Sequence, residues 1–275
     1  ANLTTTQIVA LTTEQISKIE VADLAAMTTA QIVAIETADL VNLTTDQIVG
    51  LSPADINALM TAQVQALTTS QFSKLTLAQV AAFTTAQIVA ITTQDFQALS
   101  TAQVTALTAT EAQSVTTGQL VTLSSSQIGA LSTAAVAALS TSAVQAFTTD
   151  QVHGLTTAQI VALTTTQIQA LQTEDIAAMS TTQGNAFTGD QIGAMNTDQI
   201  NALVSCPLVL DLNGDGIHST SITDGVTFDI HGTGSKVAVG WISSGDGLLC
   251  LDVNHNGAID SGKELFGTAT ESATG

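Results

Sequence analysis

From Leu3 to Leu203 the chain repeats one eight-residue phrase, Leu-Thr-Thr-x-Gln-Ile-x-Ala, without an insertion or a deletion. Every eighth position of this stretch carries a bulky apolar residue. A period this short and this strict predicts a repeat architecture, in which each unit packs mainly on its neighbours. The phrase contains no general base and no set of metal ligands, so we expect no catalysis from the array.

Each repeat, here called an octad, has the start signals of a helix. In the first octad, Thr4 is placed to cap the backbone N–H of Gln7, and the Gln7 side chain to cap the N–H of Thr4. This reciprocal pair is a capping box, and Leu3 and Ile8 are spaced to form the accompanying hydrophobic staple. Pro53 falls at the first helical position, where its missing N–H costs nothing. Each octad therefore predicts one helix of about two turns.

Helices this short are not stable alone in water, so the octads must stack and share a continuous core. We expect a mainly α protein, with an α-solenoid over residues 1–204. A longer period is also present, because residues 12–43 match residues 68–99 at 19 of 32 positions, an offset of seven octads. The shared departures include Val21 and Leu77, which both replace Thr. The sequence leaves open whether seven octads form a superhelical repeat.

Charge excludes several partners. Lys and Arg together number 4 against 23 Asp and Glu, and the formal net charge is −19. Such a chain is not expected to bind nucleic acid or an anionic membrane surface, whereas divalent cations suit it. No run of eighteen apolar residues is present, so we expect no membrane insertion.

The octad stops after Leu203, and Cys206-Pro207 marks the change of character. Residues 205–275 alternate short apolar runs with Gly, Asp and Asn turns, which predicts a small β-rich domain. Two acidic loops directly follow apolar runs. Their candidate calcium ligands are Asp211, Asn213 and Asp215 in the first loop, and Asp252, Asn254, Asn256, Asp260 and Glu264 in the second.

Oxygen-bearing side chains at alternate positions, followed by a Gly, supply the hard ligands that Ca²⁺ requires. Neither loop has a Glu at the twelfth position, since Ile222 and Lys263 stand there. The missing bidentate acid predicts weak binding, with a dissociation constant of about 10⁻⁴–10⁻³ M. The alternative is that these residues form ordinary turns, in which Asp, Asn and Gly are common. Two such loops in one short segment favour Ca²⁺.

The stretches Pro207–Gly216, Phe228–Gly232, Gly240-Trp241 and Asp246–Gly267 carry a family resemblance. They resemble the calcium-binding module of RTX-related, hemolysin-type proteins, which are large secreted or surface proteins of bacteria and include adhesins. The resemblance implies Ca²⁺-dependent folding at the cell surface or outside the cell, after type I secretion. The array resembles Thr/Gln/Leu-rich repeats of similar large bacterial proteins, which names no activity.

Cys206 and Cys250 are the chain's two cysteines. In an oxidising extracellular setting they could form a disulfide, and the alternative is two separate buried thiols. The four histidines are scattered, which does not favour a transition-metal site.

These features favour a structural protein over an enzyme. We expect either a subunit of a self-associating filament or the stalk of a calcium-dependent adhesin that contacts neighbouring surface proteins. Non-closing head-to-tail contacts between repeat arrays build filaments. The alternative is a binding module whose rows of Thr face ice or a glycan. No pair of groups suited to acid–base or nucleophilic catalysis is present outside the acidic loops, so we expect no enzyme.

Overall fold

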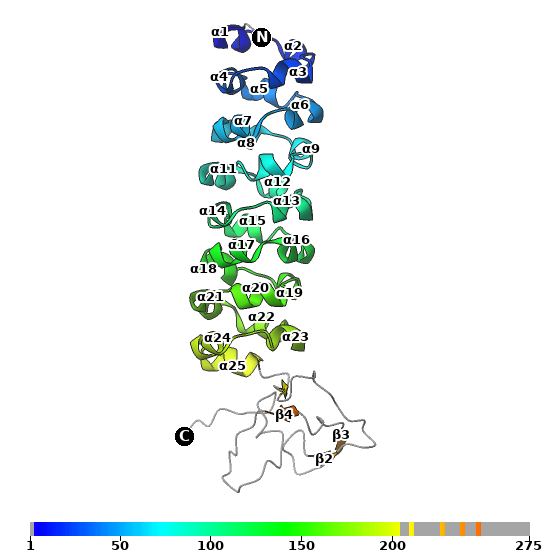
Figure 1. The fold of residues 1–275 in the computed structure, drawn as a ribbon, viewed down its shortest axis with the longest axis vertical. Coiled ribbons are helices and arrows are strands. Elements are labelled where there is room, and N and C mark those ends of the chain that lie inside the picture. Colours follow the sequence, from blue (N-terminus) through cyan, green and yellow to red (C-terminus); the bar gives the residue numbers. More distant parts are fainter. Residues whose placement is uncertain (1–2, 204–208, 212–225, 229–236, 240–245, 249–275) are drawn as a thin grey trace. The chain divides into compact units, whose positions relative to one another are not determined.

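The computed structural model describes residues 3–203 and the backbone of four short strands at residues 209–211, 226–228, 237–239 and 246–248 (Figure 1). The array consists of 25 short helices, one in each octad, which confirms the mainly α expectation. The chain divides into two compact units, Ala1–Ala170 and Leu171–Gly275. Each unit is described by itself.

The first unit contains helices α1 to α21. Their bounds are α1 Thr5–Val9, α2 Thr13–Ser17, α3 Val21–Ala25, α4 Thr29–Val33, α5 Thr37–Leu40, α6 Thr45–Val49, α7 Pro53–Ala58, α8 Thr61–Ala66, α9 Thr69–Phe72, α10 Leu77–Val80, α11 Thr85–Ala90, α12 Thr93–Gln97, α13 Thr101–Thr105, α14 Ala109–Ala112, α15 Thr117–Leu120, α16 Ser125–Ala130, α17 Thr133–Ala138, α18 Thr141–Gln145, α19 Thr149–His153, α20 Thr157–Ala162 and α21 Thr165–Ala170.

Capping boxes start most of these helices, as the sequence predicts. At α1, the Thr4 hydroxyl oxygen accepts from the Gln7 N–H at 3.3 Å, and Gln7 Oε1 accepts from the Thr4 N–H at 2.8 Å. Thr4 itself is extended, with φ −77° and ψ 162°, as an N-cap residue should be. Pro53 is the first residue of α7, which confirms its expected position.

Several helices are shorter than the expected two turns. Helices α5 and α9 have 4 residues each, or about one turn. The reason is that an octad must also hold its N-cap and an extended bulky residue that turns the chain into the next helix. Leu59, for example, has φ −54° and ψ 139° directly after α7.

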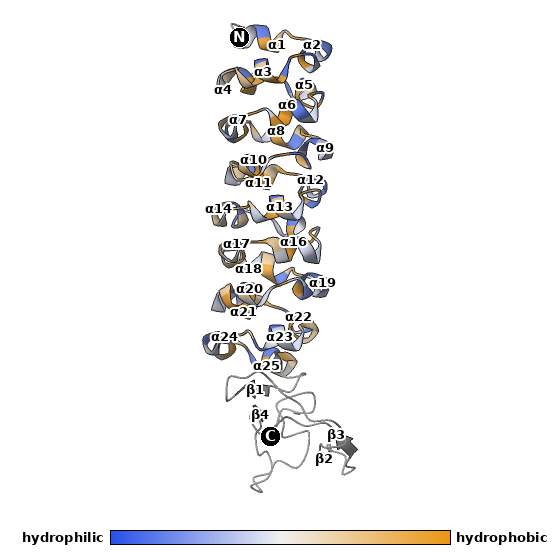
Figure 2. Cartoon of the chain, turned by 45° about the vertical axis from the view of Figure 1, so that its right-hand side comes forward, coloured by the Kyte–Doolittle hydropathy of each residue, from blue (hydrophilic) through white to orange (hydrophobic). Residues whose placement is uncertain are grey.

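The first unit is a superhelix of stacked helices. Each helix packs on the third helix along the chain, as in the series α8, α11, α14, α17 and α20. The recurring apolar positions of the octad face inward, so that Ile16, Ile48, Ile88 and Ile128 have no exposed surface. Figure 2 shows hydrophobic and hydrophilic residues mixed within the helices of the stack, as expected when one stripe of each helix is buried.

Adjacent turns approach closely at a glycine in the first unit. A Cβ built on Gly154 would lie 2.1 Å from the backbone oxygen of Ser125, whereas a Cβ on Gly118 meets nothing nearer than 3.7 Å. We therefore expect Gly154→Ala to lower the free energy of unfolding by about 1–3 kcal/mol, because backbone would have to move. Gly118→Ala is the matched control, and we expect it to be neutral or to stabilise its helix by about 0.5–1 kcal/mol. Denaturant unfolding measures both, and equal effects would contradict the close approach.

The second unit continues the octads with α22 Thr173–Ala178, α23 Thr181–Gly184, α24 Gly189–Ala194 and α25 Thr197–Leu203. Strands β1 Val209–Asp211 and β4 Asp246–Leu248 form one antiparallel pair, and β2 Val226–Phe228 and β3 Val237–Val239 form another. The expected domain boundary at 204/205 lies at the edge of the described residues and stays a prediction, as does a β-rich domain. None of the described helices is long and apolar enough to cross a membrane.

Candidate functional site

The Gln position of the octad makes long-range side-chain hydrogen bonds within the described array, to residues up to 31 positions away. Oε1 of Gln119 accepts from the capping N–H of Thr116 at 2.9 Å. Its Nε2 donates to two backbone carbonyls in the preceding turn of the superhelix. These acceptors are Ile88 O at 2.6 Å and Ile91 O at 2.8 Å. Ile91 follows the last residue of α11, where the helix itself supplies no donor to its carbonyls. One side chain thus caps its own helix and the end of another.

The same arrangement recurs along the first unit with constant spacing. Every acceptor pair of this kind lies 28 and 31, or 28 and 30, residues before the glutamine. The donors are Gln47, Gln63, Gln71, Gln79, Gln87, Gln103, Gln119, Gln127, Gln151, Gln159 and Gln167. We call this set the glutamine ladder. Within the second unit, Gln199 donates to Leu171 O at 2.7 Å, again 28 residues back.

The ladder sets the superhelical period. A spacing of 28 residues is three and a half octads, so successive turns are offset by half an octad. The seven-octad offset of the duplicated block is then two turns. Seven octads therefore return a residue to the same face of the superhelix, which answers the question that the sequence left open.

The sequence predicts the capping role of Gln but not its second role. A capping box needs only an acceptor at this position, and Glu would serve as well as Gln. Yet Gln fills most of the positions in this acidic chain, while Glu fills one, at Glu111. The need for a donor explains this preference, because only the amide can accept from the cap and donate to carbonyls at once.

Two of the aspartates at this position form a different bond. Asp39 Oδ1 accepts from the Thr13 hydroxyl at 2.7 Å, and Asp95 Oδ1 accepts from the Thr69 hydroxyl at 2.6 Å. Both hydroxyls lie 26 residues back, at the first position of a helix in the preceding turn. The shorter acid therefore replaces the amide–carbonyl contact with a hydroxyl–carboxylate contact.

Glu111 keeps the geometry of glutamine without its donor. Its Oε2 accepts from the Thr108 N–H at 2.6 Å, as glutamine Oε1 does, which leaves Oε1 in the place of Nε2. Oε1 is buried and has no hydrogen-bond partner. Burial raises the pKa of the Glu111 carboxyl, and the bonds from Thr108 partly oppose this. In the ladder register, the carbonyls of Val80 and Phe83 are the acceptors at this place.

Asp175, in the second unit, has a related environment. Its Oδ2 is buried without a partner. Burial, and secondarily the negative charge of Glu174, raise its pKa from 3.8 to about 6. A raised carboxyl pKa makes the folded state less stable as the pH rises from about 3.8 to about 6.

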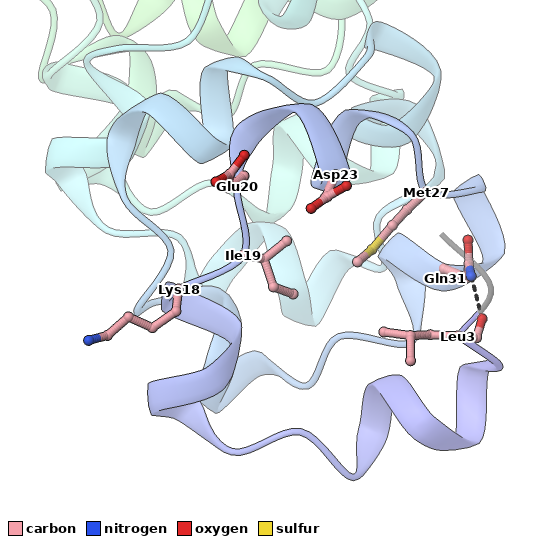
Figure 3. A pocket seen from close by; sticks show the side chains of 7 residues that line it. All are labelled: Leu3, Lys18, Ile19, Glu20, Asp23, Met27 and Gln31. Carbon is pink, nitrogen blue, oxygen red and sulfur yellow. Dashed lines mark hydrogen bonds between the residues drawn. The ribbon is translucent and has the colours of Figure 1, made fainter.

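The described array also has a hollow at its N-terminal end, with a volume of about 410 Å³. Figure 3 shows its lining, with the apolar Leu3, Ile19 and Met27 beside the acids Glu20 and Asp23. The Gln31 amide donates to the Leu3 carbonyl at its side, with the same 28-residue spacing as in the ladder. The hollow holds no constellation that suggests catalysis.

The residues that the sequence predicts as ligands are mostly outside the described part. The backbone of Asp211 ends β1, where it lies opposite Asp246 of β4. The other seven predicted calcium ligands and both cysteines lie outside the described residues: Asn213, Asp215, Asp252, Asn254, Asn256, Asp260, Glu264, Cys206 and Cys250. Among the described residues, no group of three His, Cys, Asp or Glu could hold a metal ion. The calcium assignment and the disulfide therefore stay predictions.

Known families match both parts of the chain. The ALTTAQ repeat matches residues 16–53, 51–85, 113–149, 136–165, 144–173 and 168–205, which together are more than half of the chain. The chain belongs to the ALTTAQ repeat family. Seven of the eleven rungs from Gln47 to Gln167 have the glutamine and its acceptors within the matched ranges, so the ladder is a feature of ALTTAQ octads in this chain.

Residues 208–275 match the SPM domain. The Iron-regulated protein FrpA of Neisseria meningitidis serogroup C is 49% identical over 71 residues, which are 25% of this chain and 6% of FrpA. Because the match covers so small a part of FrpA, it shows similarity of one segment only. It agrees with the expected relation to large bacterial proteins but names no calcium ligand and no partner.

Proposed function

We propose that the chain is a structural part of a secreted bacterial protein, in which the ALTTAQ array is a spacer or filament segment. The glutamine ladder carries this proposal. Each rung joins the cap of one helix to the end of another about three and a half octads away, so the array is held together along its length by repeated identical bonds. Such a solenoid separates or connects what lies at its ends without chemistry of its own.

The similarity to an iron-regulated neisserial protein supports a bacterial setting. A place at or outside the cell surface is our proposal from the resemblance to RTX-related proteins. Type I secretion, the route that RTX-related proteins take, remains part of this proposal. The finer alternatives are a filament subunit and the stalk of an adhesin. An ice- or glycan-binding role has less support, because the first Thr of each pair is already engaged as a cap, as Thr4 and Thr116 show. That the chain is not an enzyme stays a prediction.

Negative-stain electron microscopy of the whole chain, with calcium and with a chelator, separates the two alternatives. A filament subunit gives particles whose length grows with protein concentration. A stalk gives short rods of one length at all concentrations. Compact particles without an elongated part would contradict both.

We further propose that residues 205–275 bind Ca²⁺. One backbone observation supports it: the register of β1 and β4 places Asp211 directly opposite Asp246. The backbone register thus places two acids at one position of the pair, and carboxylates are the ligand type that Ca²⁺ requires. Asp246 is an acid outside the two loops that the sequence predicts as calcium sites.

Calcium is therefore expected to stabilise the whole chain. At about 1 mM free calcium and a dissociation constant of about 10⁻⁴–10⁻³ M, the gain is about 0.4–1.4 kcal/mol for one site by mass action. Thermal unfolding with millimolar calcium or with a chelator measures it, and Asp211→Asn and Asp252→Asn should each reduce the shift. Asp150→Asn, at an exposed position in the first turn of α19, is the matched control that should leave the shift unchanged. An identical transition with calcium and chelator would remove the metal assignment.

A further inference from the structure

A line of exposed aliphatic side chains runs along the outside of the first unit. Because one turn is 28 residues, positions separated by this spacing lie above one another in successive turns. Four of the large exposed apolar residues share one such line: Val21, Val49, Leu77 and Val161, with exposed fractions of 39%, 38%, 51% and 51%. Exposed Thr105 and Thr133 occupy the two turns between Leu77 and Val161. We call the four apolar residues of this line the aliphatic row.

Contacts between turns confirm the alignment of the row. A Cβ built on Gly50, the residue after Val49, would lie 2.5 Å from Cγ1 of Val21. In the next turn, Gln79 Nε2, two residues after Leu77, donates to the Val49 carbonyl at 3.3 Å. Val21, Val49 and Leu77 therefore belong to three neighbouring turns on one face.

The composition of this face departs from the rest of the array. Val21 and Leu77 are the only large apolar residues at the first position of any of the described helices, where Thr is the rule. They are seven octads apart, so the two-turn duplication places both departures in the same row. Helical stacking does not require them, because Thr serves at this position in most other octads.

A row of charges lies three residues before the aliphatic row. Its members are Lys18, Asp46 and Lys74, again one turn apart from each other, and all three are exposed. Figure 3 shows the Lys18 side chain extending away from Leu3 and Met27. The chain has only 4 basic residues, so two of them at this face, on either side of an acid, form an alternating pattern of charge along the superhelix.

We propose that this face pairs with the same face of a second copy, with the two superhelices antiparallel. A two-fold axis that crosses the face between the turns of Val49 and Leu77 brings Val49 of each copy against Leu77 of the other. The same axis brings Asp46 of each copy to Lys74 of the other, so that both apolar and charged contacts are made twice. The contact is isologous and closes at two copies.

Charge and period select this occupant and this direction. If the axis instead crossed the turn of Val49, Lys18 of one copy would face Lys74 of the other, and Asp46 would face Asp46. Like charges would then face each other, which is unfavourable. A parallel pair would place the charged rows on opposite sides of the contact, where they could not meet. A second copy also has the same one-turn spacing of side chains, so that the two contacts between Val49 and Leu77 lie one turn apart and Val21 faces Thr105 in the next turn.

The inference rests on the proposed function, since lateral pairing is one form of self-association of a structural array. Sedimentation equilibrium of the whole chain at low ionic strength tests it. We expect a dimer that Lys74→Asp weakens at least about tenfold, because Asp46 of one copy then faces an acid of the other. The double variant Asp46→Lys, Lys74→Asp restores the pair of opposite charges and should restore dimerisation.

Leu77→Asp should also break the dimer, whereas Val89→Asp, on an equally exposed residue outside the row, is the matched control. Circular dichroism verifies that each variant keeps its helical content. Two outcomes would contradict this face as the contact while leaving self-association intact. One is that Val89→Asp and Leu77→Asp weaken the association equally, and the other is that the double variant does not restore it. A wild-type chain that stays monomeric at all concentrations, with calcium and without it, would overturn both this inference and the filament.

Discussion

Replacing Gln119 with Glu is expected to destabilise the array by about 3 kcal/mol at neutral pH, the scale of an uncompensated buried charge. The variant keeps the cap, because a carboxylate oxygen can accept from the Thr116 N–H as Oε1 of Gln119 does. The variant loses the two ladder hydrogen bonds of residue 119, because its second carboxylate oxygen replaces the Nε2 donor, which lies 2.6 Å from Ile88 O and 2.8 Å from Ile91 O. An oxygen facing two carbonyl oxygens is unfavourable, and protonation is the only relief.

Gln7→Glu is the matched control. Gln7 makes the same capping box with Thr4, but its side chain is exposed, at the N-terminal end of the described array. We expect this change to stay within about 0.5 kcal/mol, as is usual for the surface. Guanidinium unfolding of both variants measures the difference. Equal effects at Gln7 and Gln119 would mean that glutamine acts only as a cap.

The reverse change at Glu111 is expected to stabilise the protein. Glu111→Gln supplies a donor where Oε1 is buried without a partner, and we expect a gain of about 1–3 kcal/mol at pH 7. The neighbouring helices in the stack, α11 and α17, contain no titratable residue. The effect can therefore be assigned to Glu111 itself.

The stability gained by Glu111→Gln should depend on pH in a definite direction. Burial raises the pKa of Glu111 above 4.5, its ordinary value, so the folded state holds this proton more tightly than the unfolded state. The stability that protonation provides is fully present below about 4.5 and is lost as the pH rises through the raised value. The advantage of Glu111→Gln should therefore be small at pH 4 and grow toward pH 7. An advantage of the same size at both values would contradict a buried, proton-dependent carboxyl.

Local chemistry explains why much of the fold was predictable. The capping box of Thr4 and Gln7 and the position of Pro53 depend on residues within one octad, and the structure has them as expected. Stacking followed because helices of this length cannot exist alone. The helices came out shorter than two turns in several octads, because extended residues such as Leu59 use part of each repeat.

The ladder could not be derived in the same way, because each rung joins residues at least three and a half octads apart. No local rule tells which turn Gln119 reaches. The signals were indirect: the preference for Gln over Glu, and the seven-octad duplication that marks two turns. For the acidic loops, the backbone register adds only that Asp211 lies opposite Asp246. The calcium ligands themselves are still sequence predictions.

The glutamine ladder is tested most directly by the exchange of glutamine side-chain amide protons, followed by NMR on the whole chain. We expect slow exchange for Gln119 and Gln159, whose Nε2 groups donate to buried carbonyls. Gln7 and Gln15, exposed in the first described turn, should exchange rapidly. Equally fast exchange at all four side chains would show that no ladder ties one turn to the next.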